Sequence, residues 1–146
     1  MAQIEIKNFG FSYPNGKKAL KNINMSVSAG EFILICGKSG SGKTTLLRNL
    51  KQSLSPKGER EGEILFEGES IFAMDKRKEA KEIGFALQNP ENAAVTDKVW
   101  HEIAFCAESL GYENAKIKRK VAEVSGFFGI TELFERKINS LSGGQK

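Results

Sequence analysis

A glycine-rich stretch directly after a short apolar run constrains the fold of this chain more than any other feature. Residues 37–45 have the sequence GKSGSGKTT and follow the apolar residues 32–36, FILIC. The apolar run is bounded by turn residues and is predicted to be a buried parallel strand. The glycines adopt backbone conformations closed to other residues, so successive N–H groups can turn toward one anion. The pattern G-x-x-x-x-G-K-[ST] therefore predicts a strand, a phosphate-binding loop and a helix, in that order.

The residues around this loop have separate chemical roles. The helix predicted over residues 43–50 directs the positive end of its dipole at the same anion. Lys43 supplies a full charge for the β- and γ-phosphates of a nucleotide, and the Thr44 hydroxyl is placed to bind Mg²⁺. A glycine-rich turn that only happens to precede a helix is the alternative, but it does not explain the order of strand, loop, Lys-Thr and helix. The candidate nucleotide-binding residues of the loop are Gly37, Lys38, Ser39, Gly40, Ser41, Gly42, Lys43, Thr44 and Thr45.

Composition favours an ordinary globular protein. Of the 146 residues, 27% are charged and 40% hydrophobic, and no apolar stretch approaches the roughly 18 residues of a membrane span. The chain does not begin with a basic and then apolar leader, so we expect a cytosolic location. Cys36 and Cys106 are predicted to be reduced core residues. The net charge is +4, but the basic residues alternate with glutamates, so we expect no nucleic-acid partner.

The first half of the chain favours strands. Residues 4–9 and 23–27 alternate apolar and polar side chains, which predicts an antiparallel β front end. Tyr13, in the turn between them, is either a stacking platform for a purine or a turn residue that packs on its neighbours. Residues 53–62 are polar and loop-like, residues 64–66 form a short strand, and residues 74–82 are compatible with a helix. A core strand over residues 82–87 would place Gln88 at a strand end that faces the site.

The second half favours helices. Thr96 or Asp97 can cap a helix that Gly111 ends, and Asn114 can cap another that Gly129 ends. These two amphipathic helices predict a small helical subdomain. His101 has no metal-ligating neighbours at the right spacing, which favours a surface or packing role. The chain ends in LSGGQK, which composition alone would assign to a flexible polar tail, but its particular residues indicate otherwise.

A phosphate loop, a strand-end glutamine, a helical insertion and then Leu-Ser-Gly-Gly-Gln together resemble the ATP-binding cassette (ABC) ATPases over essentially the whole chain. The resemblance implies an α/β fold of the P-loop NTPase class, with a partly parallel sheet, an antiparallel β front end and a helical subdomain. Residues 1–90 would form the nucleotide-binding core, and residues 91–146 the helical subdomain with the signature motif. By resemblance, Tyr13 stacks on adenine, and Gln88 contacts Mg²⁺ and the attacking water. The signature residues that would bind ATP held by the opposite subunit are Ser142, Gly143, Gly144 and Gln145.

A finer resemblance involves residues 88–92, QNPEN, together with residues 95–99 and 102–105. These stretches are similar to the ATPases of energy-coupling factor transporters, which import vitamins and metal ions such as cobalt. Trp100-His101 and the run to Gly111 are most similar to members with two fused ATPase domains, whereas Ala93 departs from the glutamine expected after Asn92. The resemblance implies ATP and Mg²⁺ as cofactors and a position on the inner face of the cell membrane. It also implies a second ATPase subunit or domain, in a homo- or heterodimer, and a transmembrane subunit that docks on the helical subdomain.

Two family features are missing from these 146 residues. No strand ending in Asp-Glu, the Walker B pair that holds Mg²⁺ and polarises water, follows the signature, and neither does the switch histidine. We therefore expect a sequence truncated before Walker B, which binds nucleotide but hydrolyses it poorly. An importer ATPase is the favoured function. A non-transport ABC ATPase acting on DNA or the ribosome and a non-catalytic nucleotide-binding module are the alternatives, while an unrelated phosphate-loop kinase would leave the signature unexplained.

Overall fold

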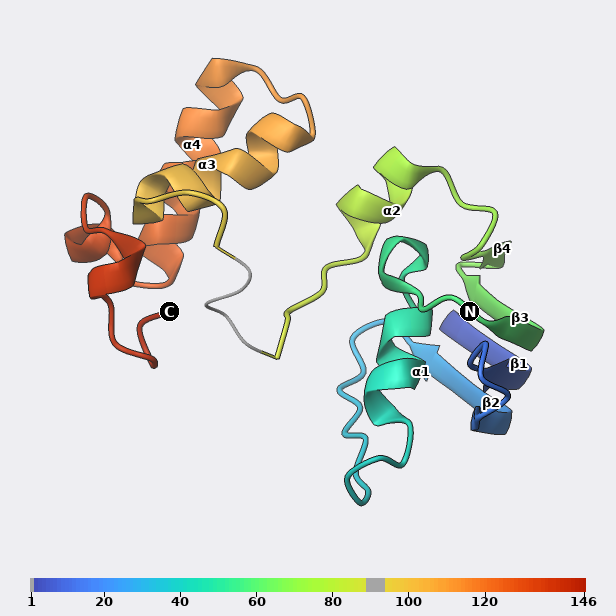
Figure 1. Cartoon of the computed structure of the whole chain (residues 1–146). Coiled ribbons are helices and arrows are strands. Elements are labelled where there is room, and N and C mark those ends of the chain that lie inside the picture. Colours follow the sequence, from blue (N-terminus) through green and yellow to red (C-terminus); the bar gives the residue numbers. More distant parts are fainter. Residues whose placement is uncertain (1, 89–93) are drawn as a thin grey trace. The chain divides into compact units, whose positions relative to one another are not determined.

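The computed structural model describes residues 2–88 and 94–146 (Figure 1). It contains two compact units, Met1–Ile83 and Gly84–Lys146. The first unit holds the strands and the glycine-rich loop, and the second holds the two longest helices. Every helix in the described parts of the chain is too short or too polar to span a bilayer.

The first unit is built on a four-stranded sheet, blue to green in Figure 1. Its strands lie in the order β2-β1-β3-β4, and every neighbouring pair is antiparallel. The strands are β1 (Ala2–Ser12), β2 (Lys18–Ser28), β3 (Glu59–Phe66) and β4 (Glu69–Ser70). This sheet confirms the predicted antiparallel front end. However, β3 begins at Glu59, inside the stretch predicted as loop-like, because residues 59–61 pair with the end of β1 despite their polar side chains.

The short helices of this unit are α1 (Lys43–Asn49), η1 (Gln52–Leu54) and α2 (Lys76–Glu82). Its core is formed mainly by apolar side chains of the sheet. Alternate side chains of β1 and β3 point into it, as the period of two in a strand requires. Leu46 of α1 contributes to the same cluster. The buried apolar members are Ile6, Phe9, Phe11, Leu20, Leu46, Ile64, Phe66, Ile71 and Met74.

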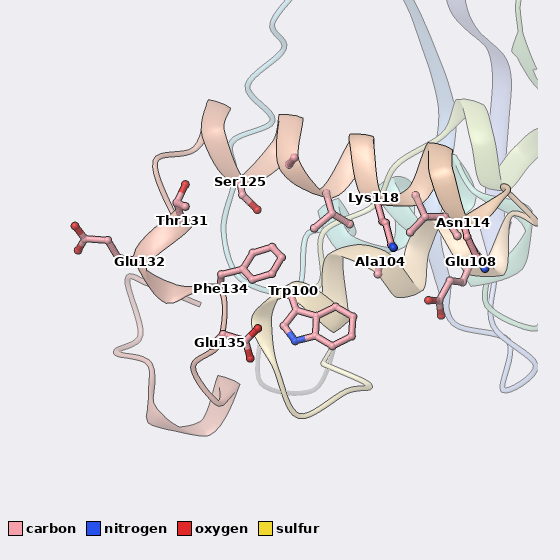
Figure 2. Close-up of a pocket in the computed structure, with 13 residues that line it drawn as sticks. Trp100, Ala104, Glu108, Asn114, Lys118, Ser125, Thr131, Glu132, Phe134 and Glu135 are labelled. Carbon is pink, nitrogen blue, oxygen red and sulfur yellow. The ribbon is translucent and has the colours of Figure 1, made fainter.

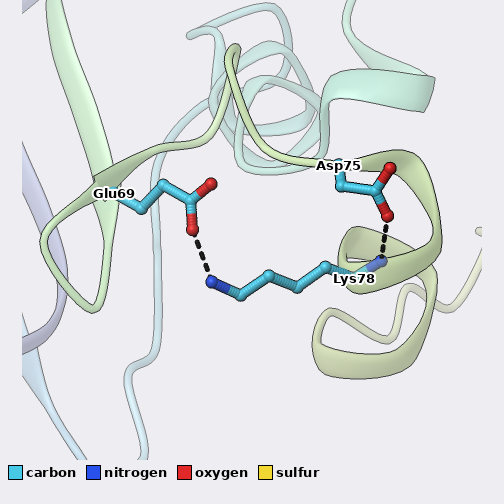
Figure 3. A network of polar contacts seen from close by, with 3 residues as sticks. All are labelled: Glu69, Asp75 and Lys78. Atoms are coloured by element: carbon cyan, nitrogen blue, oxygen red, sulfur yellow. Dashed lines mark hydrogen bonds and ion pairs between the residues drawn. The ribbon is translucent and has the colours of Figure 1, made fainter.

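Helix α2 begins one residue after an aspartate that caps it. Asp75 Oδ1 accepts hydrogen bonds from the N–H groups of Arg77 and Lys78, at 2.9 and 3.1 Å, which satisfies donors that the helix leaves free. The Lys78 ammonium also pairs with Glu69 on β4 (Figure 3). This hydrogen bond raises the pKa of Lys78 above its ordinary value of 10.5. The cap and the ion pair together attach α2 to the end of the sheet.

The second unit contains the two predicted amphipathic helices, α3 (Val99–Ser109) and α4 (Asn114–Phe127), followed by η3 (Thr131–Leu133) and η4 (Ile138–Ser140). Small side chains of α3, Ala104 and Ala107, pack against Ile117 and Val121 of α4. The segment after η3 returns to the start of α3, where Lys98 forms a 2.9 Å ion pair with Glu135. That hydrogen bond raises the pKa of Lys98.

The predicted caps of α3 and α4 are wrong. Lys98 and Glu113 occupy the cap positions, and neither makes a side-chain capping bond. At α3, the Glu102 carboxylate instead folds back to accept hydrogen bonds from the N–H and the hydroxyl of Thr96, both at 2.8 Å. A carboxylate in the first turn thus satisfies free donors near the helix start, as in a capping box.

The buried parallel strands predicted over residues 32–36 and 82–87 are also wrong for this structure. Residues 32–36 form no strand, and Phe32 is 91% exposed. Residues 83–88 form no strand either, and Glu82 belongs to α2. A parallel strand exists only through hydrogen bonds to its neighbours, and the sheet found in the described residues consists of β1 to β4 alone, so neither stretch is paired in it. Cys36 is consequently exposed, and so is Cys106 on α3, so neither is the predicted core residue.

Candidate functional site

The glycine-rich loop folds as a compact turn ahead of α1. Gly40 and Gly42 have φ values of 77° and 95°, a region that other residues rarely adopt. The Ser41 N–H donates to the Lys38 carbonyl at 3.2 Å and closes the loop, and the Leu46 N–H donates to Gly42 at 2.8 Å and begins the helix. The predicted loop and helix are therefore joined without a break at Lys43.

The ammonium group of Lys43 lies inside the loop. Its Nζ donates to the carbonyl oxygens of Gly37 and Lys38, at 2.7 and 2.8 Å, and lies 3.4 Å from Ser41 Oγ. A phosphate that enters the loop would meet this full positive charge and the loop N–H groups together. Thr44 is exposed, which leaves its hydroxyl accessible to a metal ion.

The loop rests directly on the sheet. A Cβ atom placed on Gly42 would lie 2.7 Å from the carbonyl oxygen of Ala19 in β2, a separation that real Cβ atoms essentially never show. Only glycine therefore permits the loop to approach the strand this closely. The approach fixes the start of α1 against the β1–β2 hairpin.

Tyr13 both packs on its neighbours and reaches the loop. Its ring meets the buried ring of Phe11 edge to face, with centroids 5.1 Å apart, and its hydroxyl lies 2.9 Å from Thr45 Oγ1. The side chain is half-buried. The structure thus brings together Tyr13 and residues 37–45 of the predicted site, all within the first unit.

A buried polar network behind the loop was missed by the sequence predictions. Asn49 is fully buried, and its Nδ2 donates to the Thr45 carbonyl at 2.8 Å. Its Oδ1 accepts from Ser55 Oγ at 2.7 Å and from Arg60 Nε at 3.4 Å. The guanidinium of Arg60 lies 4.8 Å from the centroid of the Phe72 ring, a cation–π contact. The one available signal was that Asn49 lies three residues after Leu46, on the buried face of α1.

The other predicted site residues belong to the second unit. Gln88 is exposed, and the rest of the QNPEN motif, residues 89–92, lies outside the described residues together with Ala93. The signature forms an exposed turn in which the Ser142 N–H donates to Gln145 Oε1 at 3.1 Å and the Gln145 N–H donates to the Ser142 carbonyl at 3.0 Å.

His101 stacks on Trp100, with ring centroids 5.0 Å apart. No cluster of three metal-ligating side chains occurs in residues 2–88 or 94–146.

A groove of about 860 Å³ lies beside α3, α4 and η3 (Figure 2). Two buried polar atoms along it, Trp100 Nε1 and Ser125 Oγ, have no hydrogen-bond partner. Its charged lining residues are three glutamates and one lysine. The full lining comprises Trp100, Ala104, Glu108, Asn114, Ile117, Lys118, Val121, Ala122, Ser125, Thr131, Glu132, Phe134 and Glu135. The groove is therefore apolar at its base and acidic overall.

The sequence of this chain is similar to those of known ATP-binding proteins. The protein-family profile described as ABC transporter matches residues 20–146. A putative ABC transporter ATP-binding protein of Bacillus anthracis is 43% identical over 147 residues, which cover 100% of this chain and 27% of the relative. The energy-coupling factor transporter ATP-binding protein EcfA of Methanothermobacter thermautotrophicus is 33% identical over 145 residues, 98% of this chain and 46% of the relative. The chain thus spans between about a quarter and a half of the length of these relatives.

A solved structure shows the same fold. The cbiO1 protein from Clostridium perfringens, part of the ABC transporter complex cbiONQ, superimposes with a TM-score of 0.85 at 29% identity. The match covers 99% of this chain and 57% of that protein. The P-loop NTPase class implied by the resemblance to ABC ATPases is therefore confirmed.

Proposed function

This chain belongs to the ABC transporter family through its match over residues 20–146, and on that premise we propose that it is all or part of the ATP-binding subunit of an importer. The observation that carries the proposal is the phosphate loop folded around the Lys43 ammonium. The importer type is supported by relatives named EcfA and by the similarity to cbiO1. The resemblance of residues 88–92 to energy-coupling factor ATPases leads us to propose a vitamin or a metal ion as the cargo.

The residues of the first unit fit Mg²⁺-ATP. The loop offers N–H groups and one ammonium to phosphate oxygens, and the exposed Thr44 hydroxyl is a hard oxygen ligand of the kind that Mg²⁺ prefers. Tyr13 lies beside the loop with a half-buried ring that we assign to the adenine base. Bound Mg²⁺ would neutralise charge that develops on the phosphates.

We assign the remaining site residues to a dimer. Gln88 would contact Mg²⁺ and the attacking water, and the signature residues Ser142, Gly143, Gly144 and Gln145 would bind ATP held by a second ATPase subunit or domain. The exposed signature turn supports this assignment because its backbone is accessible to a partner. The assembly would lie on the cytoplasmic face of the membrane without contact to nucleic acid.

The groove beside α3 and α4 supports docking of a transmembrane subunit on the helical unit. Its apolar base, unpaired Trp100 and Ser125 donors and net acidic rim suit a segment with apolar side chains and a basic residue.

Changing Ala122 to arginine should therefore abolish co-purification of this chain with the co-expressed transmembrane subunit, because the new side chain fills the groove. Ala115→Arg, an exposed change on α4 outside the groove, is the matched control. Retention of the partner by both variants would move the docking site elsewhere.

Titration of residues 1–146 with ATP in the presence of Mg²⁺ tests the proposed function. We expect saturable binding to one site per chain and little release of phosphate, because no Asp-Glu pair follows the signature in these residues. Calorimetry measures the first and a phosphate-release assay the second. No detectable binding would reject the proposal, and rapid Mg²⁺-dependent turnover would reject slow hydrolysis while leaving nucleotide binding intact.

A further inference from the structure

The hydroxyl of Tyr13 makes a contact that stacking on a base does not require. Its oxygen lies 2.9 Å from Oγ1 of Thr45, the third residue of α1. The two residues are 32 positions apart in the sequence and lie in the same compact unit. Phenylalanine could stack on a purine as well as tyrosine does, but it could not form this hydrogen bond.

The fold holds the Tyr13 side of the bond in place. The N–H of Tyr13 donates to the Lys17 carbonyl, and its own carbonyl accepts from the Gly16 N–H, both at 2.9 Å. The Tyr13 ring is packed edge to face on Phe11, which is 1% exposed. Because the turn and the ring contact fix the side chain, the hydroxyl stays directed at α1.

The helix side of the bond is equally constrained. Thr45 is buried, and its carbonyl accepts a hydrogen bond from the buried amide of Asn49. Three residues earlier, Gly42 lies against the backbone of Ala19 in β2. The first turn of α1 is thus held to the β1–β2 hairpin near both Gly42 and Thr45. The loop N–H groups lead into this turn, so a shift of the turn would move them.

We propose that the Tyr13 hydroxyl is a positioning group for the phosphate loop, acting through Thr45 in addition to any contact of the ring with a base. The inference rests on the proposed function, because it concerns the same ATP site. The ring acts only on ligands that carry a base. The hydroxyl acts through the loop on every ligand that carries phosphates, so the two roles separate when the ligand has no base.

The test compares ATP with inorganic triphosphate. Tyr13→Phe should weaken binding of both ligands by the same factor, roughly two- to tenfold, as expected for one hydrogen bond. The double variant Tyr13→Phe/Thr45→Val should bind no more weakly than Thr45→Val alone, because the bond is already lost. In a Thr45→Ser background, which keeps the hydroxyl, Tyr13→Phe should again cost the same factor.

The outcomes are distinguishable by calorimetry on residues 1–146. A loss confined to ATP would assign the whole effect of Tyr13 to the base and overturn the inference. Tighter binding by Tyr13→Phe, or additive losses in the double variant, would overturn it as well. If the unsubstituted chain binds neither ligand, the proposed function fails. If it binds both and Tyr13→Phe changes neither affinity, only the positioning role fails.

Discussion

Affinity for Mg²⁺-ATP should fall about a hundredfold when Lys43 is replaced by alanine, since hydrogen bonds from a charged donor are each worth about 1.5–3 kcal/mol. The ammonium lies inside the loop on the carbonyls of Gly37 and Lys38, where incoming phosphates would meet it. Alanine removes this charge from inside the loop and leaves the backbone N–H groups, the exposed Lys38 and the short α1 to attract an anion. Isothermal titration calorimetry of the two proteins measures the difference.

Lys57→Ala is the matched control for Lys43→Ala. Lys57 is exposed in the same unit, outside the glycine-rich loop, so its replacement removes the same charge from the protein without touching the loop. At physiological salt, the attraction between an exposed charge and a nucleotide is screened over about 8 Å. We therefore expect Lys57→Ala to bind Mg²⁺-ATP within about twofold of the affinity of the unsubstituted chain. Equal losses in both variants would show that net charge, and not the loop, attracts the nucleotide.

Replacement of Gly62 by alanine should lower the free energy of unfolding by about 2–5 kcal/mol, from a left-handed backbone plus overpacking. Gly62 lies in β3 opposite the irregularity in its pairing with β1, and its φ is 73°. A Cβ atom there would lie 2.3 Å from the Lys7 carbonyl oxygen and 2.4 Å from that of Asn8. Both contacts are backbone, so neither can move without breaking the β1–β3 pairing. Urea denaturation followed by circular dichroism measures the loss.

The Gly68→Ala variant separates the cost of the left-handed backbone from the cost of overpacking. Gly68 has a similar φ of 83°, but nothing lies within 4 Å of the Cβ position. This variant should therefore lose only the conformational part, about 1–2 kcal/mol. A Gly62→Ala variant no less stable than Gly68→Ala would mean that the sheet accommodates the added methyl group. The expected loss is large because a chain of this size has a net stability of only roughly 7–20 kcal/mol.

Local patterns predicted the elements whose stability is local. The alternation in residues 4–9 and 23–27 became the paired strands β1 and β2, and the two amphipathic helices predicted between residues 96 and 129 became α3 and α4. The apolar run over residues 32–36 has an equally clear local pattern, but it forms no strand. A strand is stable only when another segment pairs with it, and a short stretch of sequence does not show whether that partner is present. The apolar pattern alone therefore could not predict whether residues 32–36 form a strand.

In the candidate site, too, the parts formed by neighbouring residues were predictable and the contacts between distant residues were not. The phosphate loop was predictable because its chemistry lies within nine consecutive residues. The bonds from Tyr13 to Thr45 and from Arg60 to Asn49 were not, because they join residues 32 and 11 positions apart. The Arg60 bond also depends on the register of the sheet, because Arg60 lies in β3 opposite Phe11. That register shifts at the irregularity opposite Gly62, in a stretch whose polar composition suggested a loop.

The unpaired segment 32–36 also determines how the isolated chain behaves at high concentration. Phe32 and Leu34 are largely exposed next to backbone groups that pair with no described strand. Unpaired apolar edges of this kind act as templates for another chain. Aggregation through this segment requires an encounter between two molecules. The initial rate of aggregation therefore rises with the square of the protein concentration. Dilution should therefore preserve the protein in solution more effectively than a change of salt.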